Sequence, residues 1–402
     1  MTDSSGDEPT LREVIDALAP MERRAGEDGE HEAAQWIAAR LGAAGCPAEI
    51  QEAQFLDGYA RGIRNLAAAG AGAGLAALVS RRLAKLGSVT AAAATLAIAD
   101  DISNGPRVYR RLGERRRMTW NVVGECGDVA APRTLVVLAH HDAAPTGQIF
   151  DERFQAWLGE RFPGLLERVD TSLPLWWAML AAPGLVALGA ARQARGMLAA
   201  GVAGSAVGVA AFQDIVSSAI VPGANDNLSA VAVLVALAER LRREPIEDLR
   251  VLLVSCGAEE VIQGGIYGFA QRHFPTLPRD RTWFLNLETV GSPRLVLVEG
   301  EGPVVMEDYP DRSYRDLIAR VAEHAGAPLR RGMRARNSTD AVVPSRAGYA
   351  TATLCSMDRN KALSHYHQLS DTPENIDYRT VRHALVVTEA VARELAVNPW
   401  IG

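Results

Sequence analysis

The most constraining feature of this sequence is a set of His, Asp and Glu residues that follow apolar runs. They are His140 with Asp142, Asp226, the pair Glu259 and Glu260, Glu288, and His367. The runs before the first, third and fourth of these positions are short and apolar, which is typical of buried strands. In open α/β sheets, ligands bind outside the carboxyl ends of the strands, so residues distant in sequence can converge there. The sequence therefore predicts a site for a divalent metal of the zinc class.

Composition permits a large folded core and gives no reason to expect nucleic acid as a partner. The chain has 402 residues, 48% of them hydrophobic and 22% charged, and a formal net charge of -6. Apolar runs predict strands at 120–124, 135–139, 249–255, 283–287, 294–298 and 350–354. Helical spacing predicts helices at 10–18, 30–41, 228–242, 264–273, 313–324 and 381–396. Alternating strands and helices predict an α/β fold, with a mostly parallel central sheet and helices on both faces.

Two apolar segments, residues 62–105 and 153–220, interrupt this alternation. Each is rich in Ala and Gly and predicts two apolar helices around a short basic turn. Two interpretations stay open: soluble helical hairpins packed on the sheet, or hairpins that enter a membrane. A full span needs about 20 predominantly apolar residues, which the second segment nearly meets, whereas the helices of the first are shorter.

Charge around the first apolar segment favours a cytoplasmic catalytic domain. Eight arginines between residues 61 and 117 flank this segment on the catalytic side, and its turn holds only Arg81, Arg82 and Lys85. Under the positive-inside rule, the catalytic side is then cytoplasmic. Residues 1–20 are acidic and polar, without the basic and apolar regions of a secretory signal. We therefore expect no secretory signal and a cytoplasmic catalytic domain, with membrane association as an open alternative.

Taken together, the motifs resemble those of the M28 metallopeptidases, the family of co-catalytic zinc aminopeptidases. The family pattern is His-x-Asp, then Gly-Ala-Asn-Asp-Asn, Glu-Glu, an Asp in Asn-Leu-Asp-x-x-Gly, and Tyr-His before Asp-Thr. This chain has His140-His141-Asp142, Gly223-Ala224-Asn225-Asp226-Asn227, Glu259-Glu260, Asn286-Leu287-Glu288-Thr289-Val290-Gly291, Tyr366-His367 and Asp371-Thr372. The resemblance covers about residues 118–150 and 220–396. It implies one zinc-peptidase-like catalytic domain over residues 1–402, with a peptide as substrate.

By position, the resemblance assigns a role to each motif residue. The implied ligands of two zinc ions are His140, Asp226 (bridging), Glu260, Glu288 and His367. Glu259 is the implied general base, since an unligated carboxylate beside a metal site can accept a proton from water. Asp142 would orient His140 by accepting its ring N–H. Glu288 stands where the family usually has Asp, so one zinc site is expected to be weaker or to hold another divalent metal.

Residues for substrate binding are less well defined by the sequence. Tyr366, Asp340 and Arg336 are candidates, and Arg336 belongs to a basic cluster at 330–336. That cluster is either a solvated loop or a clamp for a substrate carboxylate. Asn227 is expected near the N-cap of the helix that follows it.

Four functions stay open at this point. The resemblance implies an aminopeptidase first, and a carboxypeptidase or dipeptidase second. A single-zinc acyltransferase of the glutaminyl cyclase kind is the third possibility. A non-catalytic scaffold on the same fold is the fourth, since a fold alone does not determine function.

Overall fold

The computed structural model describes residues 6–113 and 115–398. Its strands form one sheet in the order β1-β2-β4-β3-β5-β9-β6-β7, with β8 paired to β6. The strands are β1 (Ala48–Leu56), β2 (Arg116–Gly127), β3 (Thr134–His140), β4 (Arg250–Cys256), β5 (Thr282–Glu288), β6 (Arg294–Glu301), β7 (Glu307–Asp308), β8 (Arg330–Ala335) and β9 (Ala350–Met357). The four neighbours β4, β3, β5 and β9 are parallel. β1, β2 and β7 pair antiparallel, as does β6 with β9, whereas β8 is parallel to β6. The predicted α/β fold is therefore confirmed, with the parallel strands at its centre.

All six predicted strands are present. Two strands that were not predicted, β1 and β8, have a clear structural reason. β1 carries Gln and Glu between its apolar residues, but its whole length pairs with β2, from Ala48 opposite Gly124 to Leu56 opposite Arg116. β8 covers most of the basic cluster at 330–336, where only Met333 is buried. Backbone pairing at the edge of a sheet thus forms strands that an apolar pattern does not reveal.

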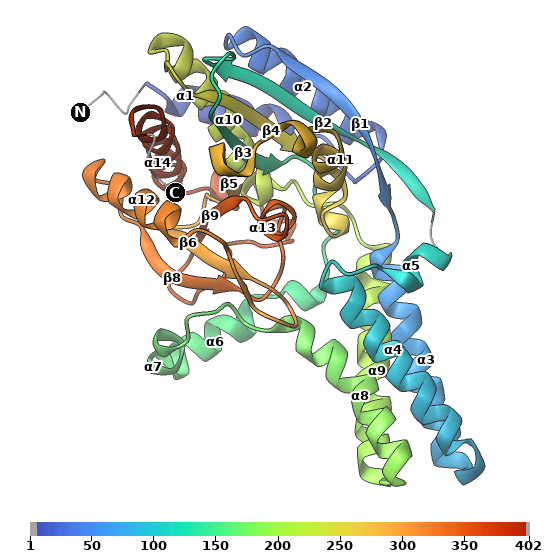
Figure 1. Ribbon diagram of the computed structural model, residues 1–402. Coiled ribbons are helices and arrows are strands. Elements are labelled where there is room, and N and C mark those ends of the chain that lie inside the picture. Colours follow the sequence, from blue (N-terminus) through green and yellow to red (C-terminus); the bar gives the residue numbers. More distant parts are fainter. Residues whose placement is uncertain (1–5, 114, 399–402) are drawn as a thin grey trace.

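Helices cover both faces of the sheet (Figure 1). They are α1 (Glu8–Leu18), α2 (Asp28–Ala43), α3 (Tyr59–Val79), α4 (Ala84–Ile102), α5 (Val108–Gly113), α6 (Arg153–Arg161), α7 (Pro163–Arg168), α8 (Leu175–Arg192), α9 (Arg195–Ser217), α10 (Ser229–Arg243), α11 (Gly264–His273), α12 (Arg312–His324), α13 (Val342–Arg346) and α14 (Tyr378–Val397). Alternate strand residues face opposite sides. Leu135 and Val137 pack with α10 and α14, whereas Val136 and Leu138 pack with α11. Both faces of the central strands are therefore buried against helices, which holds their carboxyl ends in place.

Four helices from the two apolar segments form a bundle that projects from the body (Figure 1). Within it, α3 packs against α4 and α9, and α8 packs against the same two helices. Both hairpins leave the body through closed stems. Leu56 pairs with Arg116 across the first insertion, and Pro145 bridges Ile220 across the second. Each insertion thus leaves and re-enters the body at neighbouring points.

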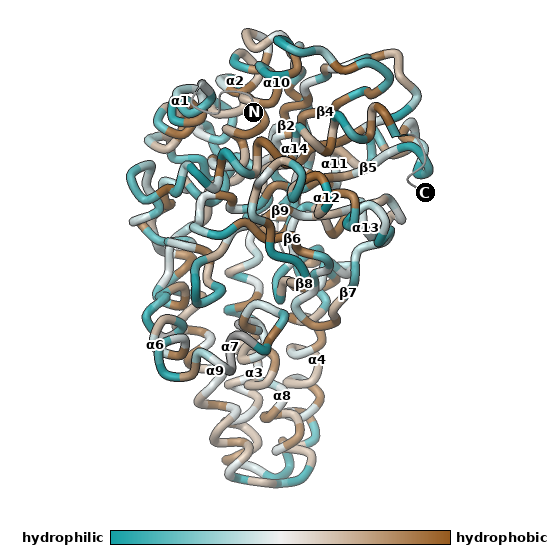
Figure 2. Tube along the Cα trace, turned by 90° about the vertical axis from the view of Figure 1, so that its left-hand side faces the viewer, coloured by the Kyte–Doolittle hydropathy of each residue, from teal (hydrophilic) through white to brown (hydrophobic). Residues whose placement is uncertain are grey.

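The bundle is apolar outside as well as inside. Exposed apolar side chains on it include Leu75, Val79, Leu86, Val89, Leu96, Leu188 and Val207. Charged residues gather at its far tip, where both turns lie: Arg81, Arg82, Lys85, Arg192 and Arg195. Figure 2 shows the pale and brown bundle ending in a hydrophilic tip. Helices over Tyr59–Val79, Arg81–Ile102 and Arg195–Ser217 are long and apolar enough to cross a membrane.

Close helix packing in the bundle depends on glycine at position 201. A Cβ atom there would lie 2.6 Å from the backbone N of Val186 and 2.8 Å from the carbonyl O of Ala182. Gly201→Ala should therefore lower the free energy of unfolding by about 1–3 kcal/mol, since overpacking displaces backbone. Gly72→Ala is the matched control, because a Cβ atom there has no neighbour within 4 Å. It should raise stability by about 0.5–1 kcal/mol through helix propensity. Equal melting temperatures for the two variants would contradict this packing.

Candidate metal centre

The predicted ligands converge at the carboxyl end of the parallel strands. His140 is the last residue of β3 and Glu288 the last of β5, while Glu260 follows β4. Asp226 stands just before α10, and His367 lies in the loop after β9. Three neighbouring strands and two loops thus bring these side chains to one place, as the sequence predicted.

Asp226 lies between the two histidines. Its Oδ1 is 3.2 Å from Nε2 of His140, and its Oδ2 is 3.2 Å from Nε2 of His367. Glu288 Oε1 lies 3.4 Å from the same nitrogen of His140, and Glu260 Oε2 lies 3.1 Å from that of His367. The five side chains therefore form two groups of three that share Asp226.

The donor set fits divalent cations of the zinc class. All five side chains are almost fully buried, and several of their polar atoms have no hydrogen-bond partner among the described residues. These atoms are Asp226 Oδ2, Glu260 Oε1, Glu288 Oε2, and both ring nitrogens of His367. Buried carboxylates this close repel one another unless a cation or a proton compensates them. Two imidazoles and three carboxylates are also the ligand types that zinc prefers.

Without a metal, protons take the place of cations in this cluster. Burial lowers the pKa of His367, but the charges of Glu260 and Asp226 outweigh it and raise that pKa to about 10. Burial raises the pKa of Asp226, but its contacts with His140 and His367 reverse this and hold that pKa below its ordinary value. Burial raises the pKa of Glu260 to about 7. A metal that binds here therefore displaces protons, and its affinity should rise with pH.

The Asn-Asp-Asn segment is held by its own side chains. Asn225 Oδ1 accepts a hydrogen bond from Gly291 N at 2.7 Å, and Asn227 Oδ1 accepts one from Thr289 N at 2.8 Å. Asn227 Nδ2 also donates to the carbonyl O of Leu287 at 2.8 Å. Asn227 lies next to Leu228, the N-cap of α10, near the predicted position. Its amide does not cap that helix but ties the segment to the end of β5. Asp226 is thereby fixed relative to Glu288.

Two further residues support the metal ligands, and sequence reasoning gave neither of them a role. The Asp371 carboxylate accepts hydrogen bonds from Asn225 N at 2.7 Å and from Asp226 N at 3.0 Å. Arg23 is fully buried and donates to the carbonyls of His141 at 2.8 Å and Pro222 at 2.7 Å. Its guanidinium thus joins the two loops that carry His140 and Asp226. The Asp-Thr motif was a signal for Asp371, whereas nothing in the local sequence marks Arg23.

Asp142 has a wider role than the predicted one. Nδ1 of His140 lies 3.2 Å from the backbone carbonyl O of Asp142 and 3.4 Å from its Oδ1, so the backbone of Asp142 as well as its carboxylate can orient the ring. Its carboxylate also accepts hydrogen bonds from the backbone N–H groups of Glu259 at 2.9 Å and Glu260 at 3.0 Å. Asp142 therefore fixes both ends of the centre, the histidine and the acidic pair.

Glu259, the predicted general base, is buried beside the ligands without belonging to either group that shares Asp226. Burial raises its pKa well above the ordinary value. Its Oε1 accepts a hydrogen bond from Nε2 of Gln263 at 2.7 Å. Gln263 Oε1 in turn accepts one from Nδ2 of Asn104 at 2.7 Å, in the turn that follows α4. This polar chain connects the base of the bundle to Glu259.

A pocket of about 300 Å³ opens beside the centre, and its lining tests the candidate substrate residues. Glu259, Glu260, His367, Tyr366 and Arg336 all line it. The Tyr366 ring stacks on that of His367, with centroids 3.9 Å apart. Asp340 does not line the pocket. It is fully buried behind it, and burial raises its pKa to about 7, so a direct substrate contact is not supported.

The basic cluster at 330–336 is mostly engaged in ion pairs. Arg331 pairs with Glu299 and Asp316, at 3.0 and 2.6 Å, and Arg334 pairs with Asp308 at 2.6 Å. Only Arg336 reaches the pocket, where its guanidinium lies 5.2 Å from the ring centroid of Trp177. The cluster is therefore not a multi-arginine clamp for carboxylates.

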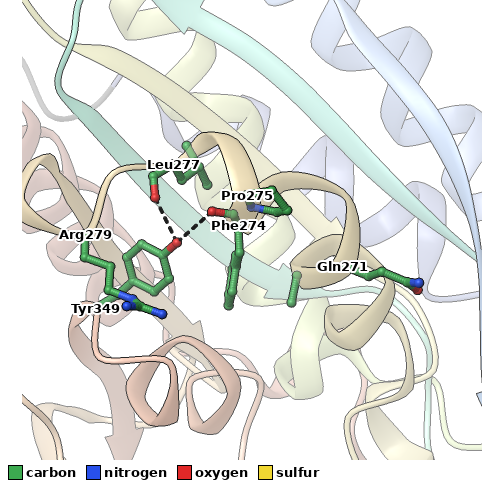
Figure 3. Close-up of a pocket in the computed structure, with 7 residues that line it drawn as sticks. Gln271, Phe274, Pro275, Leu277, Arg279 and Tyr349 are labelled. Carbon is green, nitrogen blue, oxygen red and sulfur yellow. Dashed lines mark hydrogen bonds between the residues drawn. The ribbon is translucent and has the colours of Figure 1, made fainter.

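A second hollow, of about 510 Å³, lies near the start of β9 and carries none of this chemistry (Figure 3). The Tyr349 hydroxyl there donates to the carbonyls of Leu277 at 2.9 Å and Phe274 at 3.2 Å. Arg279 is the one charged residue among its lining residues. The hollow thus lies at the amino ends of the strands and offers no metal ligand.

Comparison with known proteins agrees with this geometry. Residues 201–392 match Peptidase family M28, and they include Asp226, Glu260, Glu288 and His367. No curated protein sequence matches the chain.

Solved structures share the fold at low sequence identity. An aminopeptidase from Aneurinibacillus sp. strain AM-1 superposes with a TM-score of 0.56 at 14% identity, covering 98% of this chain and 94% of that one. The zinc aminopeptidase BSAP from Bacillus subtilis has a TM-score of 0.56 at 13% identity, covering 98% and 96%. A glutaminyl cyclase from Bacteroides thetaiotaomicron has a TM-score of 0.56 at 12% identity, covering 97% of each chain.

The fold and the donor set define a zinc metallopeptidase of the exopeptidase fold class. The resemblance to the M28 family that the motifs predicted is confirmed by the match over residues 201–392.

Adjacent histidines offer a matched test of the metal centre. His140 faces the carboxylates through Nε2, whereas Nδ1 of the buried His141 lies 2.9 Å from Ser255 Oγ. Burial lowers the pKa of His141 to about 3, so it is neutral. His140→Asn should lower zinc affinity by at least about tenfold, whereas His141→Asn should keep it, because Asn can replace Nδ1 but not reach as far as Nε2. The zinc content per chain after dialysis, measured for each variant, tests both expectations. Equal zinc loss in the two variants would refute the assignment.

Proposed function

We propose that this protein is an exopeptidase that uses two zinc ions and removes N-terminal residues from peptides. The observation that supports this most strongly is the position of Asp226, shared by two ligand groups, with Glu259 beside it. Glu259 lies outside both of these groups, although it also comes close to His140 and Glu260. His140, Asp226 and Glu288 would hold one ion, and Asp226, Glu260 and His367 the other. Bound zinc would polarise the substrate carbonyl and lower the pKa of a water molecule.

The protein's own residues would then move the proton. Glu259 accepts it from the attacking water and passes it to the leaving amine, as a general base and then a general acid. Gln263 holds one carboxylate oxygen of Glu259, which leaves the other for the water. Asp142 and Asp371 keep the ligands in register through backbone N–H groups and exclude alternative loop positions.

The pocket favours an aminopeptidase over a carboxypeptidase. Glu152 lines it and offers an anionic partner for the substrate's α-ammonium group. The two cations that line the pocket, Arg336 and Lys361, already have partners. Arg336 lies over the Trp177 ring, and Lys361 Nζ donates to the carbonyl O of Val169. A carboxypeptidase or dipeptidase is therefore the second candidate. A glutaminyl-cyclase-like acyltransferase is the third, because the same fold occurs in the Bacteroides thetaiotaomicron enzyme.

Turnover of a small peptide panel distinguishes these reactions. We expect loss of the N-terminal residue from amidated peptides with a free N-terminus, and none from N-acetylated ones. Hydrolysis of acetylated but not amidated peptides would instead identify a carboxypeptidase. Cyclisation of N-terminal Gln without hydrolysis would identify a cyclase.

Substitution of the base should separate catalysis from metal binding. Glu259→Gln keeps the shape of the side chain but cannot take up a proton. We expect kcat to fall by about 10²–10⁴-fold, with zinc content and melting temperature unchanged. Glu323→Gln, in an exposed position near the end of α12, is the matched control and should leave kcat unchanged. Full activity of Glu259→Gln would rule out this residue as the base.

We also propose that the bundle crosses a lipid bilayer and leaves the catalytic body on the cytoplasmic side. α3 and α9 have 21 and 23 residues, hence lengths of about 31 and 34 Å at 1.5 Å per residue. The hydrocarbon core of a bilayer is about 30 Å thick, and Arg61 and Arg64 in the first turns of α3 would lie in the headgroup region. Residues 66–99 and 173–213, which form most of the bundle, contain no acidic residue and five cations, namely the five at the tip. On the body side Arg107 and Arg110 are buried beside Asp101, which leaves six arginines against the five tip cations. This small excess, under the positive-inside rule, supports the orientation.

A single cysteine at the tip tests both parts of this proposal. Gln193 lies in the exposed turn between α8 and α9, and the four native cysteines are buried. We expect Gln193→Cys to react with a membrane-impermeant maleimide added outside intact cells, whereas Gln271→Cys in α11 should react only after lysis. Reaction of both residues only after lysis would contradict crossing. A soluble protein, monomeric or paired through the bundle, would contradict insertion.

A further inference from the structure

All four helices of the bundle contribute to the pocket beside the metal centre. Tyr59 of α3, Ile102 of α4, Met179 of α8 and Phe212 of α9 are buried side chains that line it. The same pocket is lined by Glu259 and His367 on the opposite side. The bundle is therefore one wall of the active site, not a separate appendage.

The two walls differ in chemistry. The bundle wall is almost wholly apolar, and Ile215 of α9 extends it. The body wall presents hydrogen-bonding groups, among them Ser338, Gln263 and Glu152. A peptide could place its backbone against the body wall while its apolar side chains face the bundle. This division favours chains with consecutive apolar residues over mixed polar ones.

Exposed apolar side chains continue from the pocket to the molecular surface. Ile149 lines the pocket with 37% of its surface exposed, and Trp177, which the lining residue Arg336 contacts, is 48% exposed. Trp157 and Phe162 of the α6 region are 54% and 46% exposed and meet edge to face. We call these four residues the apolar rim. Figure 1 shows α6 beside the bundle on the body side, at the level where the bundle leaves the body.

The position of the rim matches the surface of a bilayer. Tryptophan is enriched where membrane meets water, because its ring is apolar and its N–H polar. Here Trp177 Nε1 donates to the carbonyl O of Pro303 at 2.9 Å, so its polar edge faces the body. If the apolar bundle lies in lipid, the rim and the pocket lie at the lipid surface.

We propose that the substrate of this site is a membrane-held peptide, whose free N-terminus enters the pocket while an apolar segment farther along the chain stays in the bilayer. This substrate class rests on the exopeptidase function and on the insertion of the bundle. This proposal differs from a preference for an apolar first residue, because it concerns the location of the rest of the peptide, in the bilayer rather than in water. Sharing one bilayer would raise the local concentration of substrate at the pocket.

Two peptides with the same first four residues test this directly. One continues with about 20 apolar residues, enough to span a bilayer, and the other with a soluble Gly, Ser and Lys segment. The full-length protein is reconstituted in vesicles of phosphatidylcholine and phosphatidylglycerol, and release of the first residue is followed by mass spectrometry. Glu259→Gln protein controls for contaminating peptidases.

We expect the membrane-held peptide to be trimmed at least about tenfold faster, but only when it shares a vesicle with the enzyme. Equal rates for the two peptides would overturn the proposal, as would an advantage that persists with the peptide in separate vesicles. Trimming of the soluble peptide alone would overturn it while leaving the exopeptidase function intact. Trimming of neither peptide would overturn the exopeptidase function as well.

A double substitution tests the contribution of the apolar rim. Trp157→Ser combined with Phe162→Ser should reduce the advantage of the membrane-held peptide severalfold and leave the soluble peptide unaffected, since neither side chain lines the pocket. An unchanged advantage would show that α6 does not contact the membrane.

Discussion

Concentrated negative charge at one end of a buried parallel sheet is the constraint on which this structure depends. Asp226, Glu260 and Glu288 meet around two imidazoles at the inner end of the pocket, with little exposure to solvent. Such a cluster is stable only with protons or cations between its members. Much of the surrounding structure serves to hold it: Asp371, Asp142 and the two asparagines of the Asn-Asp-Asn segment act through backbone N–H and carbonyl groups. The chemistry that we propose follows from this enforced proximity.

Sequence reasoning located the centre because strand ends and ligand types coincide. His140 and Glu288 each terminate a short apolar run of the kind that is typical of a buried strand. Because parallel strands end at one edge, their convergence could be predicted without knowledge of the strand order. The central strands were predictable for the same reason, whereas β1 and β8 were not, since their pairing partners rather than their side chains make them strands.

Contacts between distant segments were beyond the reach of such reasoning. Arg23 occupies an unremarkable position in the sequence, yet its guanidinium reaches carbonyls about 120 and 200 residues away. Gln263 lies four residues after Glu259, but its amide is aimed at that carboxylate by a turn with left-handed backbone at Ile262 and Gln263. Asp340 shows the opposite error, in that a promising motif position proved to be buried behind the pocket. Loop conformation decides these cases, and it is set by the whole fold.

The closed stems of the two insertions have a consequence for how such a protein could arise. Leu56 opposite Arg116 and Pro145 opposite Ile220 would be neighbours whether or not the helices between them existed. The central sheet and the metal ligands could therefore predate the bundle, and each hairpin could be acquired as a lengthened turn without disturbing strand register. Neither hairpin alone would cover its apolar faces, because each packs mainly on the other. Their histories would then be coupled, so that related chains should carry both hairpins or neither.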